Sequence, residues 1–290
     1  MARTPQTFSQ IQSLRERYYK ALPGKESLIK TINEAEVSEH VYNSNAIENS
    51  TLSLEETEKI LLQIELERYV SEREIFEAKN LARVMTYVDQ KAHEEEISLL
   101  LILRLHTMLI ANIRDDIAGR FRTGDEWVRV GSYIAADPKE IEKLLTDMLT
   151  TYLSSSHEHV ITRIARLHLA FEHVHPFVDG NGRIGRALNN YALIRLGYVP
   201  INIAFVNRAD YYEAFKAFDA KGAIGGMEEI VGRALTNSYH KRLAYMEGKS
   251  IITLNEYAKS TKESHANMIN KAKRQTIEAF LEKGEWKMGI

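Results

Sequence analysis

The chain has 290 residues, 44% of them hydrophobic and only 5 of them proline, which suits a large buried core and excludes wholesale disorder. A formal net charge of −2 excludes a general polyelectrolyte binder of nucleic acid, and the lack of cysteine excludes disulfides, thiolate zinc sites and cysteine nucleophiles. Residues 1–10 have no apolar segment typical of a signal peptide, and the most apolar run, 97–110, is too short to span a bilayer. We therefore expect a cytoplasmic protein with no membrane partner.

The first half of the chain has apolar residues at three- and four-residue spacing, which predicts amphipathic helices. These helices are expected at 8–20, at about 28–48, at 71–90 and at 96–113. Leu22-Pro23-Gly24 separates the first two. Ser53 and Glu56 have the spacing of a capping box, in which each side chain accepts a hydrogen bond from the other residue's amide, so a further helix should begin there.

The pattern changes at residues 119–134. Phe121-Arg122 and residues 127–130 alternate in polarity on either side of Thr123-Gly124-Asp125, which predicts a short β-hairpin with its turn at these three residues. Asp137-Pro138 then has the pattern of a helix start, with the aspartate as N-cap and proline at the first helical position.

A glycine-rich loop between two helices is the most informative segment of the chain. Residues 161–174 form an amphipathic helix that should end near His175, because Pro176 disfavours helical geometry at the residue before it. A helix resumes at Gly182, with Ile184, Leu188 and Tyr191 facing inward, and Gly197 and Pro200 close it. The loop between them therefore points free amide groups and the positive end of a helix dipole at one spot.

The residues of this loop have the chemistry of a polyphosphate site. Arg183 and Arg186 are three apart and reach along one face of the new helix. Asp179 suits Mg²⁺, which proteins hold through one or two carboxylates together with phosphate oxygens, and His175 is a candidate general base. A metal site built from His168, His173, His175 and Asp179 is an alternative, but these histidines lack the i, i+4 spacing of helical zinc sites.

The segment HPFVDGNGRIGR, residues 175–186, matches the signature HPFx[DE]GNGRxxR and thereby resembles the Fic (Fic/Doc) family, whose members transfer AMP from ATP to a protein hydroxyl. The resemblance implies an all-α Fic-fold helical bundle with residues 119–134 as its flap. It also implies a role for each loop residue: His175 as catalytic base, Phe177 as loop anchor, Asp179 as Mg²⁺ ligand, Gly180, Asn181 and Gly182 as anion hole, Arg183 as a further catalytic phosphate contact, and Arg186 on the γ-phosphate. The flap residues Trp127, Val128 and Arg129 would dock the target by strand addition, although packing against the domain is the alternative for Trp127 and Val128.

A second family motif lies upstream. SNAIEN, residues Ser44–Asn49, matches the inhibitory pattern [ST]xxxE[GN], and the resemblance implies an N-terminal autoinhibitory helix in which Glu48 pairs with Arg186. The alternative is an ordinary helix C-terminus with Asn49 as its left-handed cap.

The tail resembles small helix-turn-helix modules of the excisionase type, with helices at 254–258 and 265–272 and a hairpin wing at 284–286. Eight Lys/Arg against five Asp/Glu from residue 249 onward give a local charge of +3. DNA contact through this winged-helix-like module and a docking or dimerising role both remain open.

We expect three parts: an N-terminal helical region at 1–92, a catalytic core at 93–248 and the tail module at 249–290. The expected function is a Mg²⁺- and ATP-dependent protein adenylyltransferase that modifies a Ser, Thr or Tyr hydroxyl, including its own, and is autoinhibited by Glu48. The alternatives are an ATP-sensing DNA-binding regulator, and a Fic enzyme that removes AMP or uses another phosphorylated donor.

Overall fold

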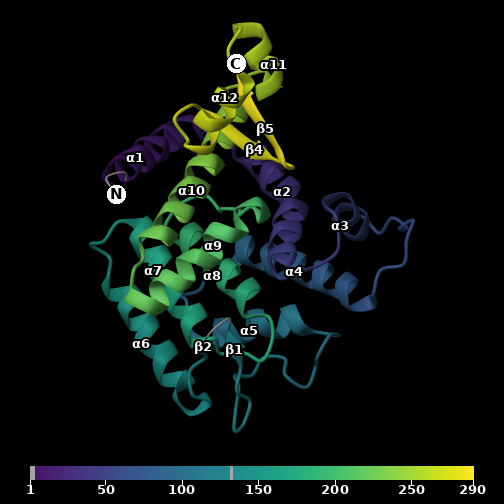
Figure 1. Cartoon of the computed structure of the whole chain (residues 1–290), viewed down its shortest axis with the longest axis vertical. Coiled ribbons are helices and arrows are strands. Elements are labelled where there is room, and N and C mark those ends of the chain that lie inside the picture. The colour runs from purple at the N-terminus through teal and green to yellow at the C-terminus, as the bar shows by residue number, and fades with distance from the viewer. Residues whose placement is uncertain (1–3, 131–132) are drawn as a thin grey trace. The chain divides into compact units, whose positions relative to one another are not determined.

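The computed structural model describes residues 4–130 and 133–290, except for the side chains of residues 4–6. The expected all-α fold with small β elements is confirmed (Figure 1). The α-helices are α1 Thr4–Ala21, α2 Glu26–Ile47, α3 Leu54–Leu61, α4 Glu72–Lys91, α5 Leu99–Ile110, α6 Ile141–Ser154, α7 Val160–Val174, α8 Asn181–Arg195, α9 Arg208–Lys221, α10 Gly225–Met246, α11 Leu254–Thr261 and α12 His265–Lys273. The strands are β1 Arg129–Val130, β2 Tyr133–Ile134, β3 Ile251–Thr253, β4 Ala279–Glu282 and β5 Glu285–Gly289.

The chain divides into two compact units. The first consists of Met1–Glu36, Val199–Asn202 and Glu229–Ile290, and the second of Val37–Tyr198 and Ile203–Glu228. The expected boundaries at residues 92 and 248 remain predictions. No helix of the described residues is both long and apolar enough to cross a membrane.

Helix α8 is the central element of the second unit. It packs against α4, α5 and α7, and its residues are buried on all sides from Arg183 to Ile194. The inward-facing Ile184, Leu188 and Tyr191 are confirmed as core residues, each no more than 1% exposed. Burial around the whole helix places its polar residues inside the protein as well, where they need polar partners.

The helix boundaries follow the capping signals of the sequence. Ser53 and Glu56 form the expected capping box at the start of α3. Asp137 accepts from the Lys139 amide, and Pro138 begins the short 3₁₀-helix η1 (Pro138–Glu140) that leads into α6. At the end of α2, Asn49 has a φ of 71°, so the left-handed cap that was named as the alternative for residues 44–49 is present.

The predicted pairing of the hairpin at 119–134 was wrong. The observed antiparallel ladder joins Arg129 with Ile134 and Val130 with Tyr133, and the connecting residues 131–132 lie outside the described residues. Arg122 does not pair within the hairpin, because its amide donates to the Pro176 carbonyl at 2.9 Å. The segment predicted as the first strand is therefore used to support the glycine-rich loop.

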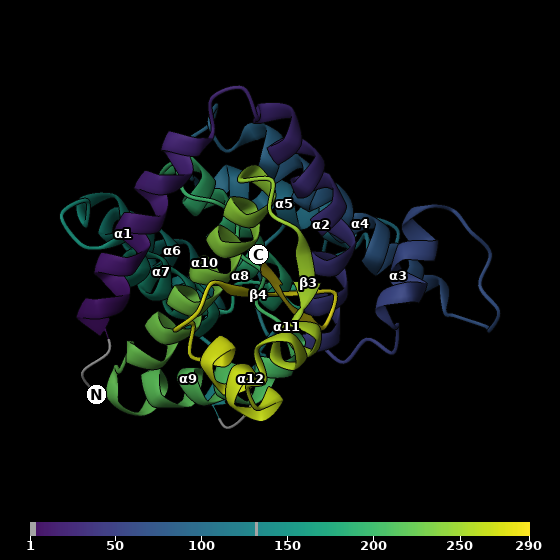
Figure 2. The same ribbon diagram turned by 90° about the horizontal axis from the view of Figure 1, so that it is seen from above.

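The first unit contains the tail module. Helices α11 and α12 and the β4–β5 hairpin occupy the expected positions. Strand β3, which was not predicted, pairs with β5 and gives the order β3-β5-β4. Figure 2 shows β3 and β4 together with α11 and α12. One cluster of buried core residues in the module consists of Leu254, Ala258, Met268, Ala272 and Ala279. Helix α1 belongs to the same unit, where Arg17 pairs with Glu247 and Glu278.

Candidate active site

His175 ends α7 in a left-handed conformation. Its φ is 50° and its ψ is 63°, and its amide still donates to the Phe171 carbonyl at 3.0 Å. The expected helix end at His175 is confirmed. This conformation is uncommon for a residue with a side chain, so the loop must hold it in place. Arg122 does so by donating from Nε to the His175 carbonyl at 2.9 Å.

The loop after His175 is closed by Phe177 and Asn181. The Phe177 ring is fully buried, and its amide donates to Asn181 Oδ1 while Asn181 Nδ2 donates to its carbonyl, both at 2.8 Å. Since both ends of the Asn181 amide are engaged with the loop backbone, this side chain defines the loop's shape. The proposed anion hole would then depend mainly on backbone N–H groups at the start of α8.

His106 on α5 contacts the same loop. The sequence analysis did not assign it a role. Its ring stacks on Phe177 with centroids 3.7 Å apart. The Gly119 amide donates to Nδ1, so Nε2 carries the proton and donates to the Asp179 carbonyl at 3.1 Å. Burial lowers the pKa of His106 to about 4, which keeps it neutral and preserves this tautomer. A buried-helix histidine within the most apolar run of the chain was the available signal.

Two glycines of the loop are needed for steric reasons. Gly180 has a φ of 85°, and a Cβ there would press on Leu109 and Ile110. A Cβ on Gly182 would collide with Oε1 of Glu48. The carboxylate of Glu48 therefore lies directly against the first turn of α8, where the helix dipole favours a negative charge.

Arg186 is bound by the end of α2. Its Nη2 donates to Glu48 Oε1 and to the Ser44 carbonyl, each at 2.8 Å, and its Nε donates to Ser44 Oγ at 2.9 Å. Nη1 donates to the Tyr211 hydroxyl of α9 at 3.2 Å. Burial alone would lower the pKa of Arg186, but Tyr211 and Glu48 outweigh it and raise the pKa. The structure thus brings Ser44, Glu48 and Arg186 together.

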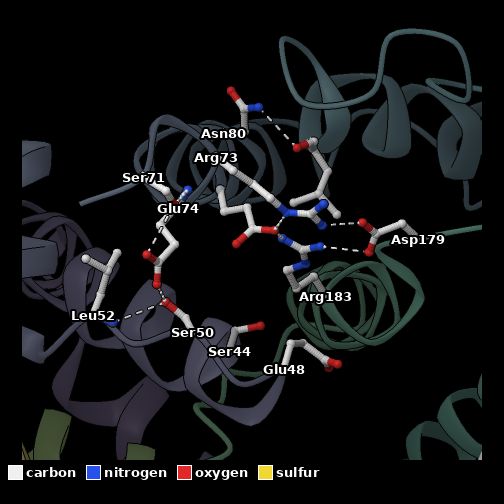
Figure 3. A network of polar contacts seen from close by, with 12 residues as sticks. Ser44, Glu48, Ser50, Leu52, Ser71, Arg73, Glu74, Asn80, Asp179 and Arg183 are labelled. Atoms are coloured by element: carbon white, nitrogen blue, oxygen red, sulfur yellow. Dashed lines mark hydrogen bonds and ion pairs between the residues drawn. The ribbon is translucent and has the colours of Figure 1, made fainter. Parts of the chain in front are cut away.

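Asp179 is held between two arginines (Figure 3). Its Oδ2 accepts from Nη2 of Arg73 on α4 at 2.6 Å, and its Oδ1 accepts from Nη2 of Arg183 at 3.2 Å. Glu77 contacts Arg73 and Arg183, at 3.1 Å and 3.2 Å. Burial acts to raise the pKa of Asp179, but Arg183 and Arg73 hold it below its usual range. The carboxylate is therefore ionised, about one third exposed and next to the loop.

The exposure of the flap residues distinguishes between docking of a target and packing against the domain. Trp127 is 53% exposed, Arg129 is exposed, and Val128 is partly buried. The Ala135 amide donates to the Val128 carbonyl at 2.9 Å, which extends the β1–β2 pairing by backbone contact. Trp127 therefore does not pack into the domain core.

The alternative metal site is not assembled. His168 contacts the Tyr211 hydroxyl at 2.6 Å, and His173 contacts Asp219 at 3.0 Å. Across residues 4–130 and 133–290, no three His, Cys, Asp or Glu side chains are grouped as a metal would require. A single carboxylate such as Asp179 fits a Mg²⁺ ion whose other ligands are phosphate oxygens and water.

The fold and site define a helical protein with a glycine-rich loop that leads into a buried helix. The Fic/DOC family model matches residues 96–193. The protein adenylyltransferase Fic of Drosophila melanogaster is 30% identical over 233 residues, covering 74% of this chain and 46% of that protein. The chain therefore contains a Fic/DOC family domain at residues 96–193, and it spans about half the length of the curated relatives it matches.

Solved structures agree with this assignment. Fic-1 from C. elegans has a TM-score of 0.70 and 26% identity, covering 85% of this chain and 74% of that one. A Fic-domain-containing signalling protein from Bacteroides thetaiotaomicron has a TM-score of 0.73 at 24% identity, covering 83% of this chain and 97% of that one, which supports the fold.

Proposed function

We propose that the chain is a protein adenylyltransferase, which transfers AMP from ATP to a hydroxyl side chain of a protein. The observation that carries the proposal is the placement of His175 directly before a glycine loop whose helix also bears Arg183 and Arg186. The name of the Drosophila relatives supports the same reaction. The target protein would present a Ser, Thr or Tyr hydroxyl, and in its absence the chain would modify itself.

The proposed reaction is an in-line displacement at the α-phosphorus of ATP. His175 accepts the hydroxyl proton, the hydroxyl oxygen bonds to the α-phosphorus, and the bond to the bridging oxygen breaks so that pyrophosphate leaves. Arg183 and Arg186 neutralise phosphate charge, while the amides of Gly180, Asn181 and Gly182 bind phosphate oxygens. Trp127, Val128 and Arg129 align the target segment along the flap.

Asp179 is the residue that would hold Mg²⁺. The metal would supply charge neutralisation between the phosphates when bound. The ionised, partly exposed carboxylate beside the loop supports this role, since hard oxygen donors suit Mg²⁺. Before Mg²⁺ and ATP bind, Arg73 and Arg183 keep the carboxylate charged and hold its orientation.

We also propose that Glu48 restrains the reaction. Its carboxylate occupies the anion-attracting start of α8 and binds the guanidinium that would hold the γ-phosphate. ATP could still enter against Arg183 and the loop, but its α-phosphorus would not lie in line with the incoming hydroxyl. Removal of AMP from a modified protein and use of another phosphorylated donor are variants of this chemistry at the same loop.

The test is incubation of the protein and of its Glu48→Gly variant with Mg²⁺ and ATP labelled on either the α- or the γ-phosphate. Covalent label from the α-position alone supports AMP transfer. Label from the γ-position, or none from either, would contradict it. The α-labelled protein is then transferred to buffer that contains Mg²⁺ but no nucleotide. Loss of label from the protein measures removal of AMP.

A second candidate is an ATP-sensing regulator that binds DNA through residues 249–290. The supporting observation is the outer face of α12, where Asn267, Asn270, Lys273 and Arg274 are exposed while Met268 and Ala272 face the core. Such a sensor would leave no covalent label on protein. DNA binding would weaken steeply with salt in a gel-shift series, because phosphate contacts release counterions, and no shift at the lowest salt would rule it out.

A further inference from the structure

A buried carboxylate lies behind His175 and has no role in the site as described so far. Glu172 is on the last turn of α7, three residues before His175, and its side chain is only 10% exposed. Among the described residues, its Oε1 has no hydrogen-bond partner. A charged group that is buried without partners costs several kcal/mol, so a fold that keeps one there needs a compensating contact.

The ring of His175 provides that contact. Oε2 of Glu172 lies 3.6 Å from His175 Nδ1, which is itself buried and has no other partner in the described structure. Hydrogen bonds of this kind are often long in ligand-free proteins and shorten when substrate binds. Burial acts to raise the pKa of Glu172, but its contact with His175 is the largest cause that brings the pKa below its usual value.

Among the described residues, the other groups around Glu172 form no ion pair with its carboxylate, and most of them are engaged elsewhere. His168 contacts the Tyr211 hydroxyl through Nε2, and burial lowers its pKa to about 4, so it is neutral. Arg186 donates to Ser44, Glu48 and Tyr211, as described above. Tyr133 of β2 donates to the Glu172 carbonyl rather than to its side chain, at 3.0 Å. Arg122 faces the backbone of the same turn. Among the described residues, His175 is the one histidine that forms an ion-pair contact with this carboxylate.

The glycine at position 185 makes the arrangement possible. A Cβ there would collide with Glu172 Oε1 and press on His168. The third glycine of the loop-helix segment thus leaves room for the carboxylate, as Gly182 leaves room for Glu48.

We propose that Glu172 is the positioning residue of the catalytic base: it accepts a hydrogen bond from Nδ1–H of His175 and so directs the lone pair of Nε2 toward the incoming hydroxyl. This inference rests on the proposed adenylyl transfer for its catalytic meaning. The carboxylate selects the Nδ1–H tautomer, fixes the ring, and stabilises the imidazolium that forms when Nε2 takes the hydroxyl proton. Glu172 itself keeps its charge throughout.

The test uses the full chain with Glu172→Gln, which removes the charge, and Glu172→Met, which removes the acceptor at similar size. Nitrogen-15 NMR of the histidine rings gives the tautomer and titration of His175 in each protein, assigned with His175→Ala. We expect the Nδ1–H tautomer of His175 in the parent and its loss in Glu172→Met. Transfer, measured in the Glu48→Gly background, should fall about 10-fold or more in Glu172→Gln, and the fall should appear in kcat more than in KM, because the base is misoriented while substrate still binds.

The matched control is Asp219→Asn, which removes a carboxylate from the exposed neighbour His173 and should leave His175 and transfer unchanged. An identical tautomer and titration of His175 in the parent and in folded Glu172→Met would overturn the proposal. If the NMR changes occur but no variant transfers AMP, the positioning contact stands and the proposed function fails. If transfer is robust and insensitive to Glu172, the function stands and the positioning role fails.

Discussion

At the scale of single residues, the account depends first on His175. Replacing it with alanine removes the proton acceptor while leaving the loop closed by Phe177 and Asn181. We expect His175→Ala to lose at least the roughly 10²–10⁴-fold that a general base contributes, with ATP affinity retained. The labelling rate in the Glu48→Gly background and calorimetric ATP binding measure the two effects. Near-normal labelling by this variant would contradict the assignment of the base.

Asp179 gives a second prediction at this scale. Asp179→Ala removes the only carboxylate next to the loop that is proposed to hold Mg²⁺, so the gain in ATP affinity from Mg²⁺ should shrink by about 10-fold or more. Isothermal titration with and without Mg²⁺ measures this difference. Asp147→Ala, an exposed aspartate of α6, is the control. Equal Mg²⁺ dependence in the parent and in Asp179→Ala would remove the proposed metal role.

The candidate site could be predicted from the sequence only where its residues are contiguous. The loop residues from His175 to Arg186 form one segment, so their spacing alone shows that they converge. His106, Arg73 and Tyr211 come from α5, α4 and α9, and no local pattern links them to the loop. Glu172 could not be predicted for another reason: in the sequence it has the pattern of an ordinary polar residue on the exposed face of an amphipathic helix.

At the scale of elements, the end of α2 is tied to α9 and to the segment before it. Arg208 donates to Asn49 Oδ1 at 2.6 Å, Tyr212 donates to the Ile47 carbonyl at 3.2 Å, and the Phe205 amide donates to Asn43 Oδ1 at 2.7 Å. These contacts hold the helix end that carries Glu48. Loosening them should release Arg186 part of the time.

We therefore expect Arg208→Ala to raise labelling by roughly three- to ten-fold, the size expected for one ordinary hydrogen bond, since this contact is exposed to solvent. The increase should be absent when Glu48→Gly is already present, because the restraint is then gone. Lys216→Ala on the same helix is the control, since Lys216 is exposed and pairs with Glu213. An equal increase in the Glu48→Gly background would show that Arg208 acts by another route.

The elements themselves were predictable where local signals decide them. The capping box, the α7 end and the α8 start all follow from side chains adjacent in sequence. The register of the hairpin was not predictable, because the Arg122 amide donates to the Pro176 carbonyl, 54 positions further along the chain. β3 was missed because three residues carry too little alternation to identify a strand, and its partner β5 lies at the other end of the module.

At the scale of the whole molecule, every proposed catalytic residue belongs to the second unit, and the tail belongs to the first. Deleting residues 249–290 should leave labelling within about two-fold of the parent, unless the tail carries the acceptor hydroxyl. The melting temperature should fall by several degrees, because Arg17 of α1 loses Glu278 and the first unit loses part of its core. Thermal unfolding and labelling of the same preparation measure both. A truncated protein that folds and binds ATP but no longer labels a target supplied separately would contradict this independence.

The central claim is that the chain transfers AMP and that Glu48 restrains the transfer through Arg186. The most direct measurement is the intact mass of the parent, of Glu48→Gly and of Glu48→Gly/Arg186→Ala after incubation with Mg²⁺ and ATP. We predict that Glu48→Gly gains the mass of an adenylyl group on the order of 10²-fold faster than the parent, since the α-phosphorus can then align, and that Arg186→Ala cancels the gain. A Glu48→Gly protein that folds, binds ATP and acquires adenylyl groups no faster than the parent would contradict the account.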